Sequence, residues 1–191
     1  VGTEALASQN FTTSVDNYNV AVGYHAGNDV TTGDLNTLIG GLSGDALTTG
    51  NRNVAVGYVA LSTDTLGDRA VAVGYGALNL QNFTTTTDNY NVAVGHTAGG
   101  AITTGFQNTL IGGIAGDALT DADFNTAVGF QTLSTDTLGS KSTALGYNAL
   151  SSQNFTTATD SFNVAVGYNA GVLVTTGTQN TLVGGEAGDA L

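Results

Sequence analysis

The sequence predicts an all-β protein, a parallel β-solenoid, from three observations. A hexapeptide of the form Asn-Val-Ala-Val-Gly-Tyr, first complete at residues 19–24, recurs along the chain. Successive closing glycines are 17 or 21 residues apart, and three intervals of 17 with one of 21 make a 72-residue super-repeat. No segment shows a sustained 3.6-residue apolar period, whereas short valine-rich runs bounded by Asn, Gly, Asp and Thr are typical of strands and turns. The closing glycines are Gly2, Gly23, Gly40, Gly57, Gly74, Gly95, Gly112, Gly129, Gly146, Gly167 and Gly184.

We therefore expect residues 1–191 to form one solenoid array, with super-repeats at 2–73, 74–145 and a partial one at 146–191. Each coil would contact mainly its neighbours and add one layer of about 4.8 Å, which predicts a rod of roughly 50 Å. The chain begins part-way through a hexapeptide and ends within a coil. We expect it to be a piece of a longer polymer, or its ends to abut other subunits.

The composition argues against two classes of partner. The net charge is −12, and the only basic residues are Arg52, Arg69 and Lys141. Lysine and arginine supply the attraction to nucleic acids and to anionic membranes, so neither partner is expected. No apolar run is long enough to cross a membrane, so we expect no membrane insertion by this segment. The chain contains no cysteine, so disulfides play no part.

The residue before each closing glycine is always Val, Ile or Leu, and we expect it to point inward and stack between coils. This predicted core stack is Val22, Ile39, Val56, Val73, Val94, Ile111, Val128, Leu145, Val166 and Val183.

Two further features concern how the coils pack. Where an aromatic ring or histidine follows the glycine, the preceding apolar position holds alanine; where Gly41 follows, that position holds Leu38. This exchange of volume predicts that the two positions share a packed layer. The asparagines that open most hexapeptides predict a stacked side-chain amide ladder.

The hexapeptides also carry a family resemblance. The pattern Asn-x-Ala-Val-Gly-Tyr-x-Ala-Leu at residues 53–61, nearly repeated at 70–78, resembles the head repeats of YadA-like trimeric autotransporter adhesins. It is also similar to repeats in tail fibres of phages and of viruses that infect algae. The resemblance implies a left-handed β-roll, a homotrimer, and an extracellular place on a cell surface, secreted fibre or virion. Coils of 17 and 21 residues are longer than the family's usual head coils.

The 21-residue coil is the main candidate for ligand binding. Its extra residues predict a protruding loop with two aromatics, repeated roughly every 19 Å, and aromatics beside Asn, Gln and Thr can stack on sugars. Alternatively these rings cover the solenoid edge or pack between chains of a trimer. The candidates are Phe11, Tyr18, Phe83, Tyr90, Phe155 and Phe162.

Metal binding and catalysis have weaker support. Asp121 and Asp123 could take part in a Ca²⁺ site, although no calcium loop motif is present and such aspartates also hydrogen-bond turns. No other cofactor is expected. The hydroxyl groups have no base paired with them, so we do not expect an enzyme.

These observations predict a structural repeat segment of an extracellular fibre or adhesin head, a rigid spacer that displays loops for surface or glycan attachment. One alternative is a filament subunit that stacks end to end without a receptor. A lesser alternative is an ice-binding solenoid, because threonine pairs recur, although they do not fill every coil. The pairs are Thr31-Thr32, Thr48-Thr49, Thr103-Thr104 and Thr175-Thr176.

Overall fold

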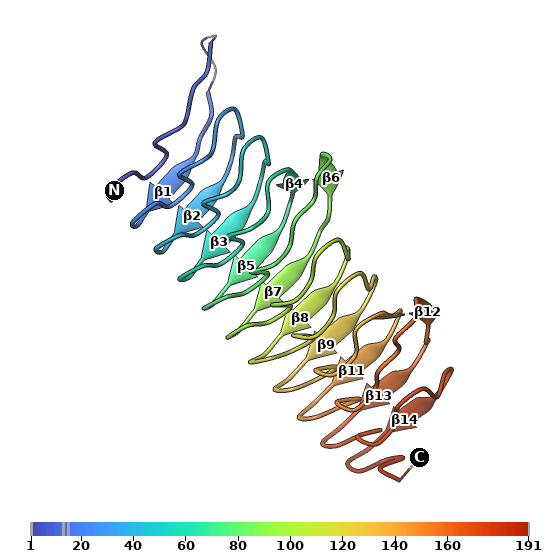
Figure 1. The fold of residues 1–191 in the computed structure, drawn as a ribbon. Helices are drawn as coiled ribbons and strands as arrows, with labels where there is room; N and C mark the ends of the chain where they lie inside the picture. The colour runs from blue at the N-terminus through green and yellow to red at the C-terminus, as the bar shows by residue number, and fades with distance from the viewer. Residues whose placement is uncertain (1, 13, 15, 191) are drawn as a thin grey trace.

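The structure is a computed structural model that describes residues 2–12, 14 and 16–190. Every regular element in this part of the chain is a β-strand. The chain winds into stacked coils that advance steadily from the N-terminus to the C-terminus, so the molecule is a rod (Figure 1). The predicted all-β parallel solenoid is confirmed.

One three-residue strand from each coil joins a ten-stranded parallel sheet. The register follows the hexapeptides, so that Val54 pairs with Thr37 on one side and Val71 on the other. In sheet order the strands are β1 (Val20–Val22), β2 (Thr37–Ile39), β3 (Val54–Val56), β5 (Val71–Val73), β7 (Val92–Val94), β8 (Thr109–Ile111), β9 (Thr126–Val128), β11 (Thr143–Leu145), β13 (Val164–Val166) and β14 (Thr181–Val183).

Two long coils add a small parallel sheet each, away from the main one (Figure 1). In the first, β4 (Gly67–Asp68) pairs with β6 (Thr87–Asp88). In the second, β10 (Gly139–Ser140) pairs with β12 (Thr159–Asp160). The extra residues are thus tied to the preceding coil by backbone hydrogen bonds.

The prediction that the core stack points inward is wrong, because these residues lie on the outer face of the sheet. Its members do pair in register, but none is buried, and Ile39, Val22 and Val183 are exposed. Side chains alternate across a strand, so in a three-residue strand only the middle one faces the interior. The position facing the interior, which we call the inner position, holds Ala21, Leu38, Ala55, Ala72, Ala93, Leu110, Ala127, Ala144, Ala165 and Leu182.

A large side chain does exchange between the inner position and a second position. The prediction that this second position directly follows the closing glycine is wrong. The ring after the glycine points outward, as exposed Tyr58 shows. Leu38 instead fills space left by glycines four residues after the closing glycine, since a Cβ on Gly27 would lie 2.6 Å from Leu38 Cδ1. In the next two coils leucines occupy that fourth position, and the inner position shrinks to Ala55 and Ala72. In the narrow interior, therefore, the large side chain lies at the inner position in some coils and at the fourth residue after the closing glycine in others.

The predicted asparagine ladder is confirmed, and it binds mainly backbone. Asn36 Nδ2 donates to the carbonyl oxygen of Gly50 at 2.9 Å, and its Oδ1 accepts from the Asn53 backbone N at 2.9 Å. Asn53 repeats the pattern with Gly67 and Ala70. Each buried amide thus links consecutive coils and satisfies backbone groups that turns would leave unpaired.

The turns of every coil contain left-handed backbone at fixed places. The second residue after the closing glycine has a positive φ even where it is β-branched, with 51° at Val59 and 50° at Ile114. Such residues are sterically disfavoured there, so each carries a conformational cost that packing between coils must offset.

Candidate binding surfaces

The outer face of the ten-stranded sheet carries exposed and half-buried apolar side chains along the length of the rod. Each strand contributes its first and last side chains to this face, and the last is Val, Ile or Leu in every coil. Ile111 is 39% exposed, whereas its neighbour Leu110 on the same strand is fully buried. None of these outer side chains is charged. The first positions hold Val20, Thr37, Val54, Val71, Val92, Thr109, Thr126, Thr143, Val164 and Thr181.

A column of aromatic and histidine rings, which we call the ring column, borders this face. Tyr58, Tyr75 and His96 stack with centroids 5.9 and 5.1 Å apart. A second triad, 72 residues later, consists of Phe130, Tyr147 and Tyr168, with centroids 5.7 and 5.4 Å apart. Gly41, Gly113 and Gly185 interrupt the column.

The loops of two long coils are held by two of the three basic residues in the chain. Arg69 forms an ion pair with Asp88 and donates from Nη1 to the Tyr90 hydroxyl at 3.1 Å, with its guanidinium 5.4 Å from the ring centroid. In the second loop, Lys141 Nζ lies 2.6 Å from Asp160 Oδ2 and 5.3 Å from the Phe162 ring centroid. Each loop is therefore clasped by a cation that contacts both a carboxylate and a ring.

The six predicted loop aromatics differ in exposure. Tyr90 is 50% exposed, and Tyr18 and Phe162 are exposed too, so these three can contact a ligand. Phe83 and Phe155 are only 6% exposed, which contradicts their prediction as ligand-binding residues and agrees with the alternative that they cover the solenoid edge. Phe11 is half-buried.

Under each of these loops lies a buried polar network that sequence reasoning missed. Asp64 Oδ2 accepts from Gln81 Nε2 at 2.6 Å, and its Oδ1 accepts from the backbone N of Phe83 at 3.0 Å. Gln81 Oε1 in turn accepts from Asn91 Nδ2 at 2.9 Å. Burial raises the pKa of Asp64, and hydrogen bonds from Gln81 and from backbone amides oppose that rise.

The signal for this network was present in the sequence. Val30 and Leu47 occupy the same place in their coils as Asp64 and Gln81 do in theirs. Two polar residues 17 apart in a column that is otherwise apolar indicate a buried pair. Asp136 and Gln153 repeat the arrangement 72 residues later.

The candidate calcium ligands hydrogen-bond to turn groups. Thr104 Oγ1 donates to Asp121 Oδ1 at 2.7 Å, and the backbone N of Phe106 donates to Asp123 Oδ1 at 2.9 Å. Burial raises the pKa of Asp123, and the nearby Asp121 carboxylate adds to that rise. Within the described residues no three His, Cys, Asp or Glu side chains come together as a metal-binding group.

The threonine pairs serve the turns on a different side from the sheet. The first hydroxyl of a pair donates to the next coil, as from Thr31 Oγ1 to the carbonyl oxygen of Thr48 at 3.1 Å. The second threonine, such as Thr32, is exposed.

Comparisons with protein-family models, with curated proteins and with solved structures found no match to this chain. The resemblance to adhesin and tail-fibre repeats therefore stays a prediction from the sequence. Among the described residues, no helix has the length and apolar character needed to cross a membrane.

Proposed function

We propose that this chain is a structural rod segment of an extracellular fibre or adhesin. In this proposal, copies associate through the outer face of the sheet, as a homotrimer, and display the long-coil loops for attachment to a host surface or glycan. The observation that carries the proposal is an uncharged outer face on which each of ten strands ends in Val, Ile or Leu, in a chain whose net charge is −12.

The size of that face fits an interface between chains. Ten strands spaced about 4.8 Å apart, each roughly 15 Å wide with the ring column, span an area of roughly 700 Å². Stable interfaces bury about 800 Å² on each partner, and contiguous apolar patches on monomers are usually smaller than this face. Since the acidic side chains lie elsewhere, chains that meet on this face bury no carboxylate.

The loops fit a role in display. Tyr90 and Phe162 occupy equivalent places 72 residues apart, each held by a cation from the preceding coil. Four coils separate them, so they recur roughly every 19 Å along the rod. Equivalent weak sites on a rigid support bind a repetitive surface with avidity.

Electron microscopy and surface binding test this proposal together. We expect discrete rods of uniform width, and binding to cells or immobilised glycans that falls when Tyr90→Ser and Phe162→Ser are combined. Unlimited end-to-end polymers would support the filament alternative instead. Unchanged binding by the double variant would contradict the role of the loops.

The outer face also favours one second candidate, an ice-binding solenoid. Its first column mixes valine and threonine in register, as at Thr126 and Thr143 on β9 and β11. Thermal hysteresis by a monomeric chain, abolished by Thr126→Tyr, would support ice binding over self-association.

A further inference from the structure

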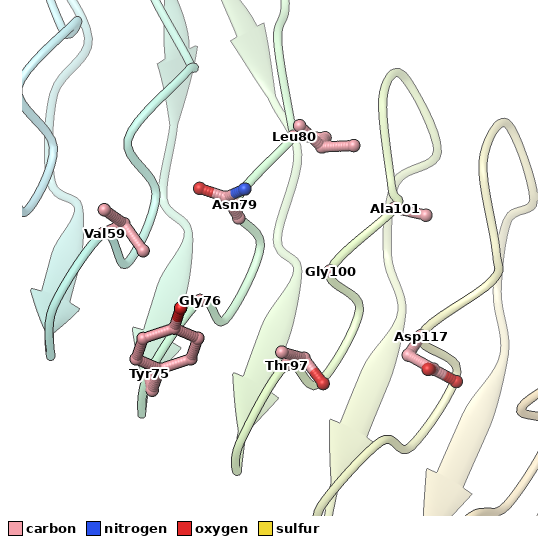
Figure 2. Close-up of a pocket in the computed structure, with 9 residues that line it drawn as sticks. All are labelled: Val59, Tyr75, Gly76, Asn79, Leu80, Thr97, Gly100, Ala101 and Asp117. Carbon is pink, nitrogen blue, oxygen red and sulfur yellow. The ribbon is translucent and has the colours of Figure 1, made fainter.

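A hollow of about 350 Å³ lies beside the ring column, over the coils that contain β5, β7 and β8. Its apolar lining comes from Val59, Leu80 and Ala101. Its polar side chains are Asn79, Thr97 and Asp117, one from each of three successive coils (Figure 2). The hollow is thus an apolar surface with one carboxylate at its edge.

The hollow exists because Gly76 and Gly100 have no side chains. In the preceding super-repeat, 72 residues earlier, Glu4 takes the place of Gly76 and His25 takes the place of Thr97. There the two side chains form an ion pair, with His25 Nε2 2.6 Å from Glu4 Oε2. The same place in the fold is therefore filled by the chain itself in one super-repeat and open in the next.

The carboxylates at the two places differ in their surroundings. Asp45 is the counterpart of Asp117, and burial raises the pKa of both. A backbone hydrogen bond opposes the rise in pKa at both residues. At Asp45 the Asp29 carboxylate adds to the rise and the charge of His25 opposes it, whereas at Asp117 the backbone hydrogen bond alone opposes it. Among the described residues, Asp45 Oδ1 and Asp117 Oδ1 are both buried without a hydrogen-bond partner, so the two places differ in the neighbouring histidine and not in this oxygen. A partly desolvated carboxylate without a cation favours one from outside.

We propose that this hollow binds a basic side chain, lysine or arginine, of a protein partner. The aliphatic part of the side chain would lie against Leu80 and Ala101, and its charged end would meet Asp117 with the Thr97 hydroxyl as a second acceptor. The net charge of −12 would draw a basic partner toward the rod. The hollow lies within one chain, although Tyr75, which lines it, also belongs to the ring column at the border of the proposed interface between chains.

A sugar fits the hollow less well, although Tyr75 lines it. Sugars stack on the faces of aromatic rings, and the Tyr75 ring is stacked between its neighbours. The Tyr58 ring lies 5.9 Å from it at an interplanar angle of 24°, and the His96 ring lies 5.1 Å away at 10°. Only the edge of Tyr75 is left for a ligand.

Backbone amide NMR of the whole chain at pH 7.5 and low salt tests the proposal. The probes are the peptides acetyl-Gly-Lys-Gly-amide and acetyl-Gly-Arg-Gly-amide, with acetyl-Gly-norleucine-Gly-amide as the uncharged match. We expect saturable shifts at Gly76, Thr97, Gly100 and Asp117 with one or both basic peptides, and affinity for the norleucine peptide at least about tenfold weaker. Comparison of the two basic peptides shows whether the hollow prefers lysine or arginine.

Matched variants locate the effect. Asp117→Asn should weaken binding at least about tenfold, whereas Asp45→Asn, at the counterpart position, should leave it unchanged. Thr97→His should also block the hollow, because the imidazole ring would occupy the place that His25 occupies in the preceding super-repeat. Shifts spread over many carboxylates, equal affinity for norleucine, or full binding by Asp117→Asn would overturn the proposal. So would shifts at these residues with N-acetylglucosamine but not with the basic peptides.

Discussion

The two faces of the sheet differ although they belong to the same ten three-residue strands. On the inner face, the strand residue is alanine or leucine according to the space that the following turn leaves. Ala55 precedes a turn that contains Leu61, and Leu38 precedes a turn that contains Gly44. On the outer face, the last residue of the strand stays Val, Ile or Leu whatever its surroundings. Packing within one coil and between neighbouring coils of a single chain explains the inner face. The outer face has a regularity that a single chain does not need, and this difference supports a partner there.

The largest expected effect separates the two faces on one strand. Leu110→Ala on β8 should lower the free energy of unfolding by about 2–5 kcal/mol, because Leu110 fills the space beside Gly99 and Gly116. Ile111→Ala on the outer face of β8 should cost less than about 1 kcal/mol in a monomeric sample. Urea unfolding measures both, and equal costs would show that the assignment of the faces is wrong.

The buried polar network should make stability depend on pH. Burial raises the pKa of Asp64 above its ordinary value of 3.8, so the folded state binds its proton more tightly than the unfolded state does. Asp64 therefore contributes its full share to the free energy of unfolding below pH 3.8. That contribution is lost as the pH rises through the raised pKa of Asp64 in the folded state. Asp45, Asp117 and Asp123 are shifted in the same direction.

Unfolding free energies measured between pH 3.5 and pH 7 test this sign. We expect the wild type to lose stability as the pH rises, and Asp64→Asn to reduce that slope. Asp121→Asn is the control, since Asp121 is exposed. A wild type that gains stability steadily toward neutral pH would contradict the burial of ionisable groups described above.

The left-handed turn residues allow a smaller, stabilising test. Ile114 has a φ of 50°, whereas the equivalent position two coils later holds Asn148, a residue that tolerates this conformation. Ile114→Asn should raise the free energy of unfolding by about 0.5–1 kcal/mol, and Asn148→Ile should lower it. If both changes destabilise the protein equally, contacts of these side chains outweigh backbone strain.

The smallest expected effect concerns the clasped loops. Arg69→Met removes an exposed ion pair, so the global cost should be within about 1 kcal/mol. Hydrogen exchange should become faster in residues 84–90 and stay unchanged in residues 156–162, which Lys141 holds. Equal exchange in the two loops would show that the cation does not hold its loop.

The fold could be predicted from the sequence because the closing glycines mark every coil, and the strands, register and asparagine ladder follow from that period. The direction of the side chains could not, since a three-residue strand such as Val54–Val56 has no long alternation to reveal its inner face. Among the loop aromatics, exposed Tyr90 contacts Arg69 of the preceding coil, and the backbone N of buried Phe83 donates to Asp64 of that coil. The repeat pattern specifies neither contact. The hollow depends on side chains missing at Gly76 and Gly100, which no motif would reveal.

Sedimentation equilibrium over a concentration series shows whether chains associate through the outer face. We expect a stable mass of three chains for the wild type. Val56→Lys with Val73→Lys, on adjacent strands β3 and β5, should give a folded monomer. The control is Thr32→Lys with Thr49→Lys on another side of the rod, which should keep the wild-type mass. A wild type that is monomeric at every concentration, or a Val→Lys variant that still associates, would contradict the account.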